Sequence, residues 1–513
     1  MKKRLLALLL SSVMAVALLA GCGNNSAGNT GGAKSTSGAK NEEPTKAADK
    51  GTDSGKLPTI KMMVVCGSIP TETKEIAAKL SEITSKKIGC NVDLVPIEIG
   101  NLTTQLNLLL SGGDDSLDVY MTGIGIPYST VVNNGQALDM AELMKPYADE
   151  MKAALGENVY NAGYINGKLY GIGHLLDQAS TTLFNLRADI ASKYGYKNGD
   201  KITLDQLTDM FAKIRKDYPD TPIIGPMNGS INFNDSRVDK LDNNLGVLAN
   251  YGQDDKVIDY YESKQYEELT GYFKKWKDMG CYMPDLLNVT DAPVDYIPAG
   301  KAFGCWAGHF SAKMNGLWST QNFGVEMASL QVFDDAVAVT PWAYECINPA
   351  TKSPEQSAGL IYLLATDPDV ENLLINGIEG VDYQRADDGS ATYVKGKDVS
   401  STGWCMGYSW ANMNSTLSLP FNYPADYFDQ LKAANKNAKQ SKAFGCQFNL
   451  TSVSDEVSAC TNVVNQYANS LAAGAADDYA STLDQFQQAL KDAGIDKIIA
   501  AKQEQLDTFL ANK

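Results

Sequence analysis

Apolar residues follow two alternating patterns along the chain. Short, nearly continuous apolar runs predict buried strands at Ile60–Cys66, Val92–Ile97 and Leu117–Met121. Between these runs, apolar residues lie three to five positions apart, which predicts helices; they are Ile76, Leu80, Ile83 and Ile88, then Leu102, Leu106, Leu109 and Leu110. Strands that alternate with helices are typical of a parallel sheet with crossover helices, so the pattern predicts an α/β fold.

The alternation continues toward the C-terminus. Further strands are predicted at 169–172, 181–186, 302–306 and 342–347, and further helices at 204–214, 266–276, 358–364 and 370–375. Residues 377–450 are rich in Gly, Asn, Pro and aromatic residues, which indicates irregular structure. The end of the chain is predicted to be helical, with a break at Ala493-Gly494.

Polar residues at the predicted strand ends are the first candidates for a site. In open α/β sheets, ligands bind beyond the carboxyl ends of the strands. The residues that we expect to form the hydrogen-bonding shell of a cleft are Ser68, Asn101, Thr122, Asp177, Gln178 and Glu379. Their hydroxyl, amide and carboxylate groups can all bond to a polar ligand.

Aromatic residues are abundant, with 25 Tyr, 14 Phe and 6 Trp. Several follow predicted strands or lie in Gly- and Asn-rich loops, notably Trp306, Trp342, Tyr408 and Trp410. A sugar ring has apolar C–H faces that stack on a flat aromatic ring, while its hydroxyls need polar partners. We therefore expect these four residues to stack on a carbohydrate; the alternative for each is a place in the core.

The N-terminus has the features of an export signal. Lys2, Lys3 and Arg4 precede the apolar run 5–20, and small residues follow. The sequence Leu19-Ala20-Gly21-Cys22 resembles a bacterial lipobox, in which the Cys becomes the lipidated first residue. The alternative is cleavage elsewhere, with Cys22 incidental. We expect residues 1–21 to be a signal peptide, and residues 22–57 to be an acylated (palmitate-type) Cys22 followed by a flexible tether.

Composition excludes several classes of function. A net charge of −17 argues against nucleic-acid binding, which needs a basic surface. The chain has no nucleotide-binding loop and no Gly-x-Ser-x-Gly, and its only histidines are His174 and His309, which leaves little for a zinc site. We expect no cofactor and no metal. Apart from Cys22, the cysteines lie mostly in apolar runs, which favours buried thiols over disulfides. A glycosidase with two carboxylates leaves no spacing signature and stays open.

Several motifs resemble those of one family, the family-1 extracellular solute-binding proteins. The stretch Asn166–Ile172 is similar to the family's G-K-x-Y-G-I-P, with Gly173 at the position of its Pro. Phe184–Asp189 is similar to Y-N-x-x-L, and Gly300–Phe303 to G-K-A-A-M. The stretches Asn376–Tyr383 and Ala493–Asp507 resemble a lipoprotein branch of that family. The resemblance covers roughly residues 58–513.

The resemblance implies a two-lobed, periplasmic-binding-protein-like fold, each lobe a mostly parallel sheet flanked by helices, with a hinge cleft. We expect one lobe at 58–176 plus about 335–376, and the other at 177–334 plus about 377–513. The implied function is that of the substrate-binding lipoprotein of an ABC importer for an oligosaccharide, not an enzyme. The implied partners are the permease subunits and the membrane, reached through the lipid on its extracytoplasmic face, and the protein is expected to be a monomer. The alternatives are a surface glycan-active enzyme and a sensor or adhesion lipoprotein.

Overall fold

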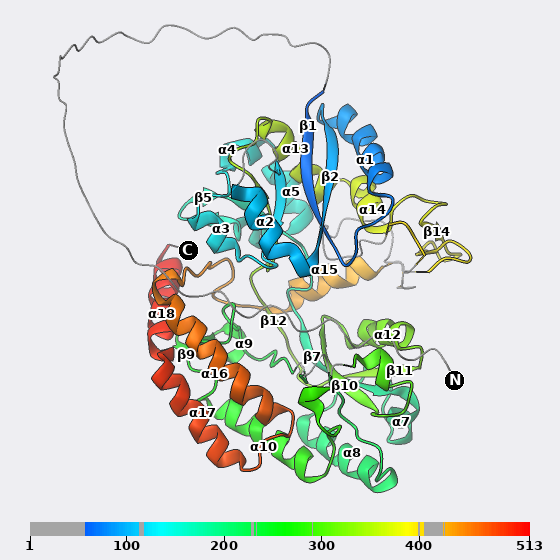
Figure 1. Ribbon diagram of the computed structural model, residues 1–513, viewed down its shortest axis with the longest axis vertical. Helices are drawn as coiled ribbons and strands as arrows, with labels where there is room; N and C mark the ends of the chain where they lie inside the picture. Colours follow the sequence, from blue (N-terminus) through cyan, green and yellow to red (C-terminus); the bar gives the residue numbers. More distant parts are fainter. Residues whose placement is uncertain are drawn as a thin grey trace, which may run out of the picture. The chain divides into compact units, whose positions relative to one another are not determined.

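Two sheets, each with its own helices, organise the protein (Figure 1). The computed structural model describes residues 57–111, 117–226, 230–231, 233–289, 291–398, 401–404, 424 and 426–512. They belong to one compact unit, Lys56–Lys513. The predicted signal and tether with Cys22, and the candidates Tyr408 and Trp410, lie outside the described residues.

The first sheet has the strand order β2-β1-β3-β13-β6. Its strands are β1 (Thr59–Cys66), β2 (Asn91–Glu98), β3 (Val119–Thr122), β6 (Gly171–Gly173) and β13 (Tyr344–Ile347). β1 runs parallel to β2 and β3, whereas β13 is antiparallel to β3 and β6. The first three predicted strands are thus confirmed, with crossover helices α1 (Thr73–Lys87) and α2 (Leu102–Ser111) between them.

Apolar spacing explains the helices of the first half. The buried side of α1 carries Ile76 and Leu80, and that of α2 carries Leu102 and Leu106, as the spacing predicts. The other helices around this sheet include α3 (Tyr128–Asn133), α5 (Ala148–Leu155), α13 (Pro354–Thr366) and α14 (Pro368–Asn376). Figure 1 shows these elements together in its upper half.

The second sheet differs from the expected parallel arrangement. It consists of β10 (Gly304–His309), β7 (Thr181–Arg187) and β11 (Met327–Gln331), in that order. Both outer strands run antiparallel to β7. Among the described residues of this second sheet, parallel pairing is limited to isolated bridges, such as that of Ile224 with Gly304. A strand's direction depends on where the connecting chain re-enters the sheet, which the apolar pattern of the strand does not encode.

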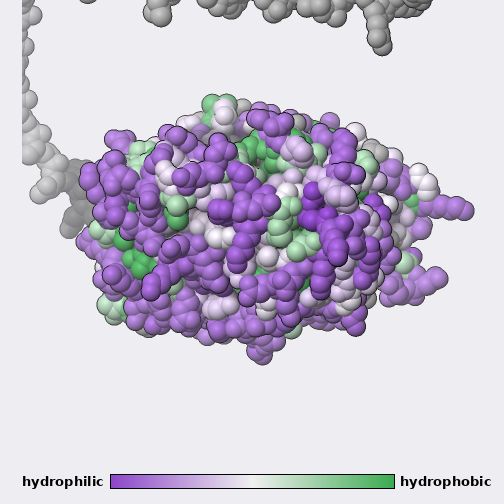
Figure 2. Space-filling view, turned by 90° about the horizontal axis from the view of Figure 1, so that it is seen from below, coloured by the Kyte–Doolittle hydropathy of each residue, from purple (hydrophilic) through white to green (hydrophobic). Residues whose placement is uncertain are grey.

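Further helices belong to the second sheet and the C-terminal half. They include α7 (Ala188–Lys193), α8 (Leu204–Asp217), α10 (Lys264–Asp278), α12 (Ala312–Phe323), α16 (Ser454–Ala472), α17 (Tyr479–Ala493) and α18 (Ile495–Ala511). Several of them, such as α8, α10 and α17, are amphipathic. α8 starts with a capping box between Thr203 and Gln206. Gly494 has φ 96° and separates α17 from α18 at the predicted break. The face in Figure 2 is mainly polar, with small scattered hydrophobic areas.

The buried apolar residues form two large clusters, one around each sheet. The first core also includes Trp404 and residues of α15 (Tyr427–Asn437), although both lie in the stretch expected for the second lobe. The second core includes residues of α10 and of the C-terminal helices. Two separate cores in one chain are the physical basis of two lobes.

Within the described residues, three segments connect the two cores: 174–180, 332–343 and 438–453. They are hydrogen-bonded to one another. Val339 N donates to Gln178 O at 3.0 Å, and Asn435 Nδ2, in the last turn of α15 just before the third crossing, donates to Gln178 Oε1 at 2.9 Å. β12 (Val337–Ala338) pairs with β16 (Lys439–Gln440) in parallel. The crossings therefore form one bundle between the lobes.

The described parts of the chain show no candidate membrane span and no disulfide among their buried cysteines. No helix there combines the length and hydrophobicity needed to cross a bilayer. Cys66, Cys90, Cys281, Cys305, Cys346 and Cys460 are buried and form no disulfide. They are the small hydrophobic side chains that their apolar surroundings in the sequence predict.

Candidate functional site

The candidate site is a cavity of about 770 Å³ beside the crossing segments. One side comes from the first half, at residues 123 and 127–133, and from the crossing residues 337–344. The other side comes from the second half and the C-terminal region, at 234–243 and 443–458. The volume falls in the range typical of ligand cavities, about 300–1,000 Å³.

Three aromatic residues form the apolar side of the cavity. Tyr128, in α3, stacks on Tyr344, in β13, with ring centroids 4.0 Å apart and planes 11° apart. Both rings are buried, and Gln447 Nε2 donates to the Tyr344 hydroxyl at 2.7 Å. Trp342 differs from these two buried tyrosines, because 41% of its surface is exposed. Its apolar face is free to stack on a ligand ring.

Gly123 permits the close approach of two segments at this wall. Its φ is 105°, and a Cβ there would lie 1.7 Å from the carbonyl oxygen of Trp342. Any side chain would push the Trp342 backbone away from β3, so the position of the exposed tryptophan depends on this glycine.

Asp177 is the most unusual polar group of the cavity. Its Oδ2 accepts from the Phe310 backbone N–H at 2.9 Å, while its Oδ1 is buried without a hydrogen-bond partner in the described structure. Burial raises the pKa of the Asp177 carboxyl to about 7, against the lowering effect of the backbone N–H groups of Phe310 and Ala179. A buried acceptor atom without a partner can accept a hydrogen bond from a hydroxyl group of a ligand.

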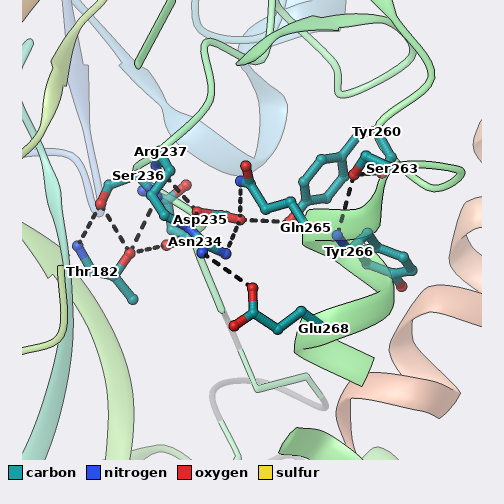
Figure 3. A network of polar contacts seen from close by, with 10 residues as sticks. All are labelled: Thr182, Asn234, Asp235, Ser236, Arg237, Tyr260, Ser263, Gln265, Tyr266 and Glu268. Atoms are coloured by element: carbon teal, nitrogen blue, oxygen red, sulfur yellow. Dashed lines mark hydrogen bonds and ion pairs between the residues drawn. The ribbon is translucent and has the colours of Figure 1, made fainter. Parts of the chain in front are cut away.

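The loop 234–246 forms the polar side opposite Trp342. Its first part is fixed by Asp235, which accepts from Arg237 at 2.8 and 2.9 Å, from the Tyr260 hydroxyl at 3.0 Å and from Gln265 at 2.7 Å (Figure 3). Further along, burial raises the pKa of Asp239 and of Asp242. Burial also lowers the pKa of Lys240. This part of the loop thus presents charged groups with shifted pKa values to the cavity, and of these Asp239 is buried.

Three of the predicted site residues line the cavity: Asp177, Gln178 and Trp342. Gln178 is 4% exposed, and its side-chain amide takes part in the bundle of crossings. Its Nε2 donates to His174 O at 2.9 Å, and its Oε1 accepts from Asn435. Gln178 therefore connects the cavity wall to the segments that join the lobes.

The other described candidates lie away from the cavity. Ser68 and Asn101 are exposed, and Glu379 is exposed with its Oε1 3.3 Å from Arg385 Nε. Thr122 is buried and its hydroxyl donates to Ile126 O at 2.7 Å, so it stabilises a turn. Trp306 is fully buried in the second core, where its ring lies 5.0 Å from Phe184 and 5.6 Å from Trp276. It fills the core instead of the cavity.

Sequence reasoning missed the Tyr128–Tyr344 stack, the loop 234–246 and the segment 443–458. Tyr128 follows a predicted strand end, so the rule used for Thr122 could have indicated it. The loop has a signal in its dense Asp and Asn content, Asn234-Asp235 and Asp242-Asn243-Asn244. The segment 443–458 has no such signal. Among the described residues, no group of three or more potential ligands is placed to hold a metal ion.

Comparisons with known proteins agree with this geometry. A curated protein of Streptococcus pneumoniae serotype 4, named carbohydrate ABC transporter substrate-binding protein, is 24% identical over 482 residues, covering 91% of this chain and 94% of the relative. The crystal structure of the N-glycan transport solute binding protein NgtS from Streptococcus pneumoniae matches with a TM-score of 0.74, at 21% identity, over 89% of this chain and 99% of that one. The chain has the two-lobed fold of extracellular solute-binding proteins.

Two further matches add detail. NgtS in complex with Man5GlcNAc gives a TM-score of 0.64 at 22% identity, with 89% of this chain and 99% of that chain covered. The family described as "Domain of unknown function (DUF3502)" matches residues 442–511. These residues include the cavity segment 443–458 and the helices α16 to α18. The resemblance to solute-binding proteins seen in the sequence is confirmed along most of the chain.

Proposed function

We propose that the protein is the substrate-binding component of an ABC import system and that it captures an oligosaccharide in the cavity. The observation that carries this proposal is the cavity itself. It lies where the crossings join two separate cores, with an exposed tryptophan on one side and buried carboxylates on the other. An aromatic face together with hydrogen-bond acceptors is the combination that a sugar ring needs.

The two NgtS matches support a binding protein that changes its arrangement. The same relative, at nearly the same identity and coverage, gives TM-scores of 0.74 when named without a ligand and 0.64 in complex with Man5GlcNAc. Sequence divergence cannot account for the difference, so the two NgtS structures differ in arrangement. The present chain is more similar to the one named without a glycan. A ligand that binds one arrangement better shifts the population toward it.

The decisive experiment is a thermal-shift and calorimetric screen against mono- and oligosaccharides, Man5GlcNAc included, with mass spectrometry of the sugars afterwards. A binding protein gains stability as RT ln(1 + [L]/Kd), about 2.7 kcal/mol at a hundredfold excess over Kd. We expect at least one glycan to raise Tm and to be recovered intact. Cleaved products would favour the glycan-active enzyme, and a protein indifferent to every glycan would favour the sensor or adhesion protein.

The remaining features of the function are also proposed. Cys22 carries the lipid, which holds a monomer at the extracytoplasmic face of the cell membrane, where the permease subunits receive the sugar. The proposed division of the chain is 58–176 with about 335–376 for one lobe and 177–334 with about 377–513 for the other, except that Trp404 and α15 pack in the first core. Cys22→Ala should release the protein from membranes or leave it unprocessed. A wild-type N-terminus without acyl mass would contradict the anchor.

A further inference from the structure

The C-terminal residues matched by the family of unknown function touch the cavity in only part of their length. The segment 443–451 and three residues of α16 line it, whereas α18 does not. One side chain of α18 nevertheless reaches the opposite wall. Lys502 is 0% exposed, and its ammonium lies beneath the loop 234–246.

The backbone of that loop is held in an unfavourable conformation. Leu241 has φ 43°, Asp242 φ 78° and Asn244 φ 61°. The left-handed region is disfavoured for residues with a Cβ, and leucine has no side-chain hydrogen bond to offset it. Such a conformation persists only where the surroundings impose it. Leu241, Asp242 and Asn243 all line the cavity, so whatever holds this backbone also shapes the site.

Lys502 supplies that restraint. Its Nζ donates to Leu241 O at 2.6 Å, to Asn243 Oδ1 at 2.8 Å and to Gly246 O at 3.1 Å, which uses its three protons on this one loop. Two carboxylates of the loop, Asp239 and Asp242, favour the charged ammonium. The Phe448 ring, from the cavity segment of the C-terminal region, lies 5.8 Å from Nζ.

The other end of the loop is fixed separately. Figure 3 shows the network around Asp235, with Thr182 and Ser236 also bonded to each other beside it. That network restrains residues 234–237 but does not extend to the strained residues 241–244. Inside the strained part, Leu241 N, Asn244 N and Leu245 N donate to Asp239 Oδ1, Lys240 O and Asn243 Oδ1 of the same loop, each at 3.0 Å. The hydrogen bonds from Lys502 in α18 tie this local structure to the rest of the protein.

Stability alone does not explain a lysine in this place. Removing a charge from water is costly, and an apolar side chain of similar volume is often neutral or stabilising at such sites. Burial indeed lowers the pKa of Lys502 to about 8, because the charged form is disfavoured there. What the ammonium provides and a methionine cannot is three hydrogen bonds that fix one loop conformation.

We infer that Lys502 is a positioning residue of the ligand cavity: its buried ammonium holds the loop 234–246 in the conformation that presents residues 239–243 to the sugar. The C-terminal region of unknown function thereby builds one wall directly and shapes the opposite wall through α18. The inference rests on the proposed function for the identity of the ligand, but not for the state of the loop.

The test compares Lys502→Met with Lys497→Met, a matched control on the same helix whose ammonium is exposed and pairs with Glu456 at 2.6 Å. Hydrogen exchange of the loop is measured first, without ligand. We expect Lys502→Met to speed exchange of the amides of Leu241, Asn244 and Leu245 at least tenfold, with β1 unchanged. Lys497→Met should match the wild type. Equal loop protection in both variants would overturn the inference.

The second readout is affinity for Man5GlcNAc by calorimetry. We expect Lys502→Met to bind at least tenfold more weakly than Lys497→Met. If the wild type binds no glycan, the proposed function fails, while the exchange data still decide the role of Lys502. Should Lys502→Met not fold, Asn243→Ala removes one acceptor and keeps the lysine. Asn243 Oδ1 also accepts from Leu245 N at 3.0 Å, so the readout in that variant is the exchange of the Leu241 and Asn244 amides alone. Faster exchange at these two amides supports the inference, and unchanged exchange overturns it.

Discussion

Burial separates two tryptophans that look alike in the sequence. Trp306 and Trp342 each follow a short apolar or Pro-containing stretch, and both were expected to stack on a sugar. In the structure, Trp306 is fully buried among aromatic rings, whereas 41% of Trp342 is exposed at the cavity. One residue type thus serves stability in one place and is available for recognition in the other.

Trp342→Ala should therefore weaken glycan binding with little effect on folding, because the side chain has few core contacts to lose. Trp306→Ala should cost about 3–5 kcal/mol of stability, as is typical for a buried aromatic residue. Chemical denaturation and calorimetry on both variants measure the two effects. A Trp342→Ala protein with wild-type affinity for the glycan would remove Trp342 from the site.

Asp177 should make glycan binding depend on pH near neutrality. Its pKa of about 7 lies above its ordinary 3.8, so the folded chain favours the neutral form, and its contribution to stability falls as pH rises from about 4 through 7. A sugar hydroxyl that donates to Oδ1 favours the ionised form instead. Affinity should then rise between pH 5.5 and 8.5, by roughly tenfold for each unit by which binding lowers the pKa.

Calorimetry across that pH range checks this, with Asp177→Asn as the control that should flatten the profile. His309 does not interfere, because burial lowers its pKa to about 4. The buried Asp239 and the exposed Asp242 also line the cavity, and their effect would remain in the Asp177→Asn protein. A rising profile that survives the substitution would assign the dependence to them.

Sequence patterns predicted eight of the described residues to be at the cavity. Three of them line it: Asp177, Gln178 and Trp342. The other five lie away from it: Ser68, Asn101, Thr122, Glu379 and Trp306. The strand-end rule selects an edge of a sheet, but only part of that edge faces the other lobe. Whether a tryptophan is buried depends on residues distant in sequence, such as Phe184 beside Trp306. Neither property is encoded locally.

At the scale of elements, the predictions follow the strength of the apolar pattern. The first strands and helices, and the break at Gly494, lie where the spacing predicts them. α16 was not predicted as a separate helix, because only Cys460 and Leu471 of its 19 residues are fully buried. The antiparallel second sheet was not predicted either, since strand direction is decided by long connections.

The crossings give a prediction about the elements that join the lobes. Asn435 donates to Leu176 O at 2.7 Å and to Gln178 Oε1 at 2.9 Å, and accepts from Gln178 N at 3.2 Å. Asn435→Ala should lose about 1.5–4.5 kcal/mol of stability, given roughly 0.5–1.5 kcal/mol for each of the three hydrogen bonds. It should also bind glycan more weakly, because the crossings then become ordered only on binding.

Urea denaturation and calorimetry provide the comparison, with Asn437→Ala as the matched control. Asn437 ends the same helix and is exposed. If the two variants do not differ in stability or affinity, the bonds between the crossings do not hold the lobes in a binding-competent arrangement.

At the scale of the whole chain, the proposed function depends on a cavity whose walls belong to the two sides of the molecule. Tyr128 and Tyr344 come from the first core, and the loop 234–246 belongs to the second half. Because each wall is held from its own side, by Gly123 and the tyrosine stack on one and by Asp235 and Lys502 on the other, the walls can approach as units.

A glycan that bridges the walls should therefore make the protein more compact. The TM-score is 0.64 to NgtS with Man5GlcNAc and 0.74 to NgtS named without a ligand, which agrees with the proposed change of arrangement. We expect the radius of gyration from small-angle X-ray scattering to decrease on saturation with a glycan that raises Tm. Trp342→Ala should show the same decrease only at higher glycan concentration, because the change is driven by binding. A saturated wild-type protein with an unchanged radius would mean that the cavity binds sugar without drawing the two walls together.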